Sequence, residues 1–172
     1  MSKFNFSAGI CPPSKKETIS RKPVKLPEVP KRLVFLLSQN KGQPSVPLVK
    51  RNEKVLIGQK IADRAAAPGN WSAPLHSSVS GKVVEIGTYN QPLQKTPSAA
   101  IIIDSDGKDN MLIPEKVRKD YYRYSPDELR SVIREAGIIG LGGSGFPTAS
   151  KILSGNEIDI LIANGCESEP MI

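Results

Sequence analysis

The middle of the chain alternates short apolar runs with glycines, prolines and polar turns. Apolar runs occupy residues 33–37, 79–86 and 99–103, and residues 48–62 contain two shorter runs separated by Gly58. Runs of this length bounded by turn residues are typical of strands, and several at this spacing indicate a small barrel or sandwich. We therefore predict that the N-terminal part of the chain is a small β barrel or a β sandwich.

A helical pattern begins after residue 124. Ser125 is a favourable N-cap, Pro126 suits the first helical position, and Glu128 completes a capping box. Apolar residues then share one helix face: Leu129, Val132, Ile133 and Ala136. Gly137 ends the pattern, so we predict a helix over residues 126–136. The fold class is mixed α+β.

Two further elements are predicted near the C-terminal end. Pro147 is placed to start a second helix that runs through Lys151 to about Leu153. Residues 158–163 are an apolar run bounded by polar residues, which predicts a buried strand.

Composition agrees with a turn-rich chain that has modest cores. The 172 residues include 15 Pro and 14 Gly, and only 5% are aromatic, which argues against a helical bundle. No apolar run approaches the ~20 residues of a membrane span, and the N-terminus lacks the pattern of a secretory signal. The two cysteines, Cys11 and Cys166, form no Cys-x-x-Cys pair, so we predict no metal site. We expect a soluble intracellular protein.

Charge is divided unevenly along the chain. Residues 1–60 hold 13 of the 24 Lys and Arg residues but only 3 of the 17 Asp and Glu residues. A basic segment can indicate nucleic-acid binding, but here the cations are spread among prolines without aromatic stacking residues. We predict no nucleic-acid partner and interpret the segment as a solvated arm or a docking surface.

A glycine-rich loop at residues 140–147 is the first candidate for chemistry. Four glycines let the backbone turn sharply and approach a ligand closely: Gly140, Gly142, Gly143 and Gly145. A loop that leads into a helix N-terminus suits a phosphate, and Lys151 could add a charge. The spacing matches neither the Rossmann fingerprint nor a P-loop. The alternative is a tight turn between two helices.

The second candidate follows the predicted strand at 158–163. Asn164, Glu167 and Glu169 lie at its C-terminal end, where ligands of open α/β folds bind. An amide and two carboxylates suit hydroxyl groups or ring nitrogens of a cofactor. The alternative is an acidic loop that faces solvent.

The strand pattern also resembles the biotinyl/lipoyl-type hammerhead, on Gly58-Gln59, Ala73-Pro74 and Gly81-Lys82-Val83. Carrier members of that family present a modified lysine on the hairpin between their two halves. Residues 61–81 contain no lysine, so we expect neither biotin nor lipoate and interpret the barrel as a structural or docking module.

The two candidate motifs together resemble the flavin- and NADH-binding domain shared by the complex I flavoprotein and the RnfC proteins of Rnf electron-transport complexes. That family has a Gly-x-Gly-Gly-x-Gly-Phe-Pro-Thr loop before a lysine, and an Asn-x-x-Glu-x-Glu-Pro loop after a strand. Both are present here in the same order. Leu141 stands where complex I proteins have arginine, as in RnfC proteins. Residues 9–13, 47–50 and 72–81 also fit RnfC proteins, so the resemblance covers nearly the whole chain.

The resemblance implies a set of cofactor contacts in the glycine-rich loop, which includes Gly145, and in the acidic loop. FMN contacts would fall to Gly140, Gly142, Lys151, Asn164 and Glu167. NADH contacts would fall to Gly143, Phe146 and Glu169. In such a protein FMN accepts the hydride and passes single electrons on, while the protein supplies orientation and electrostatics.

The resemblance also implies a domain plan. We expect a basic, proline-rich arm (1–32), the barrel-sandwich (33–110), a linker (111–124) and the first part of an FMN/NADH-binding domain (125–172). RnfC proteins continue through the flavin domain into iron–sulfur motifs, and cysteines for those clusters are absent from these 172 residues. We therefore expect an incomplete, inactive part of an NADH-dependent electron-transfer protein.

The expected partners are other electron-transfer proteins, in an Rnf-type membrane complex or a soluble reductase. The expected location is the cytoplasm or the cytoplasmic face of the membrane, without membrane insertion. Cys166 and Ser168 depart from RnfC proteins, which have Ala and Cys there. This departure resembles the RnfC-like protein that accompanies clostridial proline reductase. Cys166 is either a redox thiol or a packed small residue. The alternative function is a non-catalytic docking module.

Overall fold

The structure is a computed structural model that describes residues 28–65, 71–90, 96–113, 120–141, 143–152, 158–160 and 162. The chain divides into two compact units. One unit is Glu28–Glu157, and it contains every helix and strand described below. The other joins Met1–Pro27 to Ile158–Ile172, so most of the predicted arm and the predicted acidic loop lie outside the described residues. The four-part domain plan stays a prediction.

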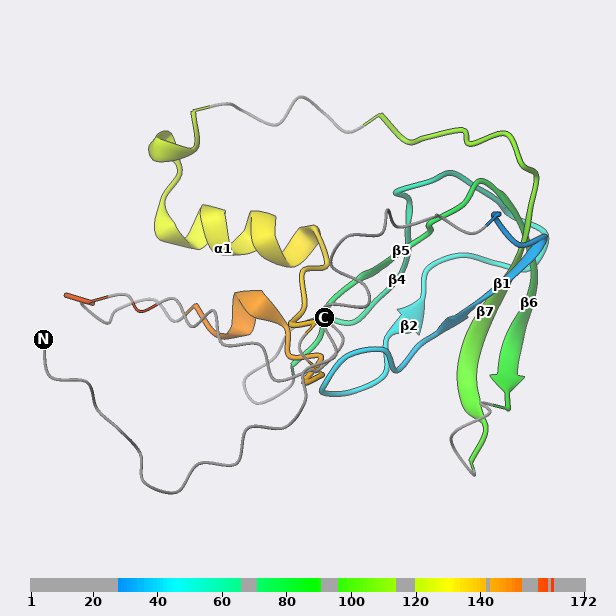
Figure 1. The fold of residues 1–172 in the computed structure, drawn as a ribbon, viewed down its shortest axis with the longest axis horizontal. Coiled ribbons are helices and arrows are strands. Elements are labelled where there is room, and N and C mark those ends of the chain that lie inside the picture. Colours follow the sequence, from blue (N-terminus) through cyan, green and yellow to red (C-terminus); the bar gives the residue numbers. More distant parts are fainter. Residues whose placement is uncertain are drawn as a thin grey trace, which may run out of the picture. The chain divides into compact units, whose positions relative to one another are not determined.

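The larger of two sheets is antiparallel and has four strands. They are β1 (Arg32–Leu36), β3 (Lys54–Val55), β6 (Gly81–Tyr89) and β7 (Ser98–Ser105). Their order is β1-β7-β6-β3, and Figure 1 shows β1, β7 and β6 side by side. The first strand therefore pairs with the last, with Leu33 opposite Ile103 and Phe35 opposite Ile101.

The second sheet has three short strands in the order β2-β4-β5. They are β2 (Val46–Pro47), β4 (Lys60–Asp63) and β5 (Leu75–His76). The strands predicted from the apolar runs are therefore confirmed, and each run lies within or beside a strand.

Side chains from both sheets meet in one core. Ile61 of β4, Val83 of β6, and Ile101 and Ile103 of β7 are fully buried, and Val55 of β3 is nearly so. The alternation of buried Ile101 and Ile103 with half-buried Ile102 is the period-two pattern of a strand with one face on the core. Burial of each such side chain is worth roughly 1.5–3 kcal/mol, so this core holds the two sheets together.

The predicted capped helix is confirmed as α1 (Pro126–Glu135). The Ser125 hydroxyl accepts a hydrogen bond from the Glu128 backbone N–H at 3.3 Å, and the Glu128 carboxylate accepts one from the Ser125 N–H at 2.7 Å. Gly137 has a φ of +69° just past the helix end, a conformation that favours glycine. A short 3₁₀ turn, η2 (Tyr121–Arg123), precedes the helix.

The helix predicted to start at Pro147 is wrong in type and length. In the described part of this segment, residues 143–152, the structure has a three-residue 3₁₀ turn, η3 (Thr148–Ser150), with Lys151 at its end. The Ser150 and Lys151 N–H groups donate to carbonyls three residues earlier, those of Pro147 and Thr148, at 3.1 and 3.0 Å, which makes this turn 3₁₀ in type. The Thr148 N–H donates to the Ile138 carbonyl at 3.0 Å, which ties the start of the turn to the glycine-rich loop.

The strand predicted at residues 158–163 is not seen in its described part. Ile158, Ile160 and Ile162 are not in a strand and are 72%, 77% and 83% exposed. A strand is stabilised by neighbours that take its backbone hydrogen bonds, and none of the described residues pairs with these three.

The closest backbone approach in the larger sheet gives a stability prediction. A Cβ added at Gly81 would lie 2.0 Å from the Asp104 carbonyl oxygen, whereas one at Gly87 on the same strand would meet only the flexible Glu85 side chain at 3.2 Å. We expect Gly81→Ala to lower the free energy of unfolding by about 3 kcal/mol, because the β6–β7 pairing must shift. Gly87→Ala is the matched control and should change it by less than about 1 kcal/mol. Urea unfolding of both variants measures this, and equal losses would contradict the close-approach argument.

Candidate functional site

The glycine-rich loop closes as a tight turn held by backbone hydrogen bonds. Gly140 donates to the Phe146 carbonyl at 2.9 Å, Gly145 donates to the Gly140 carbonyl at 3.1 Å, and Ile139 bridges to Pro147. Gly143 and Gly145 have φ values of +92° and +56°, which side-chain-bearing residues rarely adopt. The glycines are thus needed for the turn itself. Because Ile139 and Pro147 pair as an antiparallel bridge, the turn is hairpin-like and differs from the tight helix-to-helix turn weighed from the sequence.

The tip of this loop is open. A Cβ added at Gly143 would meet nothing within 4 Å, and the neighbouring Leu141 is 89% exposed. At Gly145 the situation differs, because an added Cβ would lie 3.4 Å from the Asn40 Cα of the barrel. Gly145 therefore serves packing, whereas the backbone at Gly143 is accessible to a ligand.

Two aromatic rings and two ammonium groups gather beside the loop. Phe146 lies 4.7 Å from Trp71, centroid to centroid, at an interplanar angle of 52°. The Lys151 Nζ lies 5.5 Å and the Lys41 Nζ 5.8 Å from the centre of the Phe146 ring. Neither lysine is paired with a carboxylate in the part of the chain that the structure describes. A phosphate group fits such surroundings, so this site suits a nucleotide cofactor.

The structure brings together five of the nine predicted cofactor-binding residues: Gly140, Gly143, Gly145, Phe146 and Lys151. The other four, Gly142, Asn164, Glu167 and Glu169, lie outside the described residues. Sequence reasoning missed Trp71 and Lys41, because both belong to the barrel and stand far from the loop in sequence. One signal was available, since Trp71 is the single tryptophan of a chain with few aromatic residues.

Charged side chains anchor the end of α1 to the second sheet. The Arg134 guanidinium donates to the two Asp63 carboxylate oxygens at 2.8 and 3.3 Å and to the Arg64 carbonyl at 2.7 Å. Lys60 is paired with both Asp63 and Glu135. The side chains of Arg134 and Asp63 are only 19% and 18% exposed, so water screens this pair incompletely. The contact sets the distance between the barrel and the glycine-rich loop, which follows four residues after Ala136.

The same contact perturbs the titration of its acidic members and of His76. Burial tends to raise the pKa of Asp63, but the hydrogen bonds from Arg134 and the Arg64 N–H, with the nearby cations, lower it overall. A hydrogen bond from Lys60, against the opposing effect of burial, lowers the pKa of Glu135. Burial and the charge of Lys60 lower the pKa of His76 below its ordinary 6.5, despite the opposing carboxylates of Glu135 and Asp63. Both carboxylates are therefore charged at neutral pH, and His76 is neutral.

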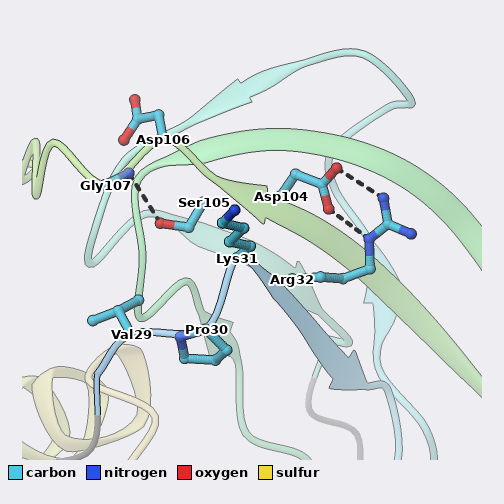
Figure 2. A pocket seen from close by; sticks show the side chains of 8 residues that line it. All are labelled: Val29, Pro30, Lys31, Arg32, Asp104, Ser105, Asp106 and Gly107. Atoms are coloured by element: carbon cyan, nitrogen blue, oxygen red, sulfur yellow. Dashed lines mark hydrogen bonds and ion pairs between the residues drawn. The ribbon is translucent and has the colours of Figure 1, made fainter.

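A separate cavity of about 730 Å³ lies at the other end of β1 (Figure 2). It is lined by Val29, Pro30, Lys31, Arg32, Asp104, Ser105, Asp106 and Gly107. Arg32 donates to both carboxylate oxygens of Asp104, at 2.6 and 2.8 Å, as Figure 2 shows. Asp106 accepts from the Ser80 hydroxyl at 2.6 Å. The carboxylates of this cavity are therefore engaged within the barrel, which suits a structural or docking role.

Among the described residues there is no group of three or more His, Cys, Asp or Glu side chains that could hold a metal ion. None of the described helices is long and apolar enough to cross a membrane.

Comparison with known families decides the membership of the chain. Residues 4–108 match the RnfC barrel sandwich hybrid domain, which covers more than half of the sequence. The chain belongs to the RnfC family. Residues 133–172 match the Nuo51 FMN-binding domain, and this second match includes the glycine-rich loop. Both parts of the predicted resemblance, and the mixed α+β fold with a barrel-sandwich, are therefore confirmed.

Relatives in the RnfC family match along nearly the whole chain. This chain is 34% identical over 170 residues to the C component of the proton-translocating ferredoxin:NAD(+) oxidoreductase complex of Clostridium ljungdahlii. The match covers 98% of this chain and 36% of that protein. It is 39% identical over 170 residues to the C component of the ion-translocating oxidoreductase complex of Pseudomonas aeruginosa, covering 97% and 21%. For the C component of the Na(+)-translocating ferredoxin:NAD(+) oxidoreductase complex of Acetobacterium woodii, identity is 31% over 175 residues, covering 97% and 37%. The chain thus spans roughly a fifth to two fifths of these relatives.

The lowered pKa of His76 gives this RnfC-family chain a defined pH dependence. The folded state disfavours the imidazolium form of His76. The stability that the neutral imidazole contributes is therefore fully present above about pH 6.5, and it is lost as the pH falls through the lower folded-state pKa. The lowered pKa values of Asp63 and Glu135 affect the free energy of unfolding only near and below the ordinary pKa values of these groups, 3.8 and 4.5. We expect the free energy of unfolding to fall from about pH 7 to about pH 5 and to fall less in His76→Gln.

The chain contains one histidine, so NMR titration of the wild type gives the pKa of His76 directly. An imidazole pKa at or above 6.5, or the same pH slope in His76→Gln, would refute this account.

Proposed function

We propose that the chain is the N-terminal, flavin-binding part of an RnfC-type protein that passes electrons from NADH through FMN toward iron–sulfur centres. The observation that carries this proposal is the position of the Lys41 and Lys151 ammonium groups within 6 Å of the Phe146 ring centre, next in sequence to a loop whose backbone is open at Gly143. The match of residues 133–172 to an FMN-binding domain supports the same conclusion.

Eight of the nine predicted residues have a role in this proposal, and the ninth, Gly145, allows the loop to pack against the barrel. The backbone at Gly140, Gly142 and Gly143 lets the cofactor approach, and Lys151 neutralises its phosphate. Asn164 and Glu167 hold FMN by hydrogen bonds, and Phe146 and Glu169 lie on the NADH side. Bound FMN supplies the chemistry, since it takes a hydride and releases electrons singly. The chain's own residues bind and orient the two nucleotides.

Partners follow from the relatives, which are named as C components of ion-translocating oxidoreductase complexes. We propose that this chain likewise works with other electron-transfer proteins, either of an Rnf-type complex at the cytoplasmic face of the membrane or of a soluble reductase. Iron–sulfur clusters would belong to a longer parent protein. Kinship with the protein that accompanies proline reductase stays a prediction.

The second candidate function is a docking module without catalysis. The barrel has a core of its own and carries the cavity lined by Lys31 and Arg32, at the opposite end of β1 from the glycine-rich loop. In this alternative the loop is vestigial, and the barrel binds another protein of the complex. Flavin binding separates the two candidates.

We expect FMN to bind the chain, and we expect Lys151→Ala to weaken binding about tenfold, because a charge-assisted contact to phosphate is lost. The measurement is a titration of flavin fluorescence. Lys108→Ala removes an equal charge from the barrel cavity side and is the control, expected to bind like the wild type. Absence of FMN binding, or equal effects of the two substitutions, would favour the docking module.

We also expect the 172-residue chain with added FMN to leave ferricyanide unreduced by NADH, beyond the rate of free FMN. Electron transfer needs the full flavin site, and the chain spans only a fraction of its relatives. Stopped-flow absorbance of NADH and ferricyanide measures this. Steady turnover that depends on the protein would show that these residues suffice.

A further inference from the structure

The barrel approaches the glycine-rich loop through two of its own loops. The Lys41 N–H donates to the Gly145 carbonyl at 2.8 Å, so the barrel backbone is bonded to the loop. Gly42 has a φ of +123°, and a Cβ there would lie 2.0 Å from the Trp71 carbonyl oxygen. Only glycine therefore lets the Trp71 segment close against Lys41, which places a tryptophan and a lysine of the barrel beside Phe146.

Trp71 keeps part of its surface exposed to solvent, although it contacts a second aromatic ring. Its ring contacts the Phe146 ring at a tilt of 52°, and the residue remains 39% exposed, while Phe146 is half-buried. A tryptophan with a free surface beside a second ring offers a planar ligand a stacking site. Nucleotide bases stack on aromatic side chains of this kind and gain affinity from the contact.

Within the described ranges, the cations beside these rings have no carboxylate to neutralise them. The Lys41 Nζ lies 5.5 Å from the Trp71 ring centre, and both Lys41 and Lys151 lie within 6 Å of the Phe146 ring centre. By contrast, the cations of the α1 contact, Lys60 and Arg134, are both paired with carboxylates. An exposed cation–π contact is weaker than a charge-assisted hydrogen bond to phosphate. Both ammonium groups therefore remain able to bind an anion.

We propose that the barrel completes the dinucleotide site. Trp71 and Lys41 form, with Phe146, a platform that binds NADH, with an aromatic base against the rings and a phosphate of the dinucleotide at the Lys41 ammonium group. Lys151 keeps the FMN phosphate that the proposed function gives it. This inference rests on the proposed function and assigns to the barrel a part in substrate binding beyond docking.

Trp71 is the single tryptophan, so its fluorescence reports on the platform alone. We expect NADH to quench Trp71 emission and to show sensitised emission of its own, because reduced nicotinamide absorbs where tryptophan emits. ADP-ribose should compete with NADH and reverse the sensitised emission. FMN is titrated in parallel and followed by its own fluorescence.

Substitutions at the platform have a matched control on the same barrel. We expect Lys41→Gln to weaken NADH binding about tenfold and to flatten its dependence on salt. Lys31→Gln removes the same charge at the opposite end of β1 and should bind NADH like the wild type. Trp71→Phe should retain NADH affinity within about threefold by calorimetry, and Trp71→Ala should lose more. Thermal unfolding of Lys41→Gln and Lys31→Gln shows whether both keep the fold.

The outcomes separate this inference from the proposed function. Equal NADH affinity of Lys41→Gln and Lys31→Gln, or quenching of Trp71 by FMN but not by NADH, overturns the platform. If FMN binds in either of these cases, the proposed function stands and the platform alone is overturned. Failure of both nucleotides to bind overturns both.

Discussion

The ion pair between Arg134 and Asp63 is the contact on which the relation of helix, loop and barrel depends. It joins the last turn of α1 to the second sheet, and the Arg64 carbonyl takes a further guanidinium donor. Partly buried charges lose hydration, and that loss is offset only when most of their hydrogen-bonding groups are satisfied. Here the carboxylate also receives the Arg64 N–H and Lys60. A saturated pair of this kind tolerates little displacement, so the glycine-rich loop that follows the helix starts from a defined point on the barrel.

From that point, backbone geometry determines what the loop presents. The hydrogen bonds between Gly140, Gly145 and Phe146 close the turn, and the bond from Lys41 attaches it to the barrel. Attachment at Gly145 leaves Gly143 facing open space. One glycine thus allows close packing and another allows access, although both stand in the same short motif.

Local patterns predicted the local structure well. The capping box at Ser125 and Glu128 and the apolar runs of β1, β6 and β7 depend on neighbours in sequence, and all are present. The second helix was wrong in type because the N–H groups of Ser150 and Lys151 bond three residues back, which the position of Pro147 does not reveal. Trp71 and Lys41 were missed because their place beside Phe146 follows from the closure of two barrel loops, which local patterns do not show. The glycine-rich loop was found because its composition is unusual in itself, and Asn164, Glu167 and Glu169 stay predictions.

Pairing of the first strand with the last has a consequence for synthesis on the ribosome. Because Leu33 lies opposite Ile103, the larger sheet is complete only after Ser105 has left the exit tunnel. Long-range pairing of this kind is slow compared with formation of a short capped helix. The residues of α1 and the glycine-rich loop emerge after every strand of the barrel, so the slow pairing of the barrel starts before this loop is available. The barrel thereby acts as a template on which the cofactor loop takes its shape, and the direction of translation favours this order.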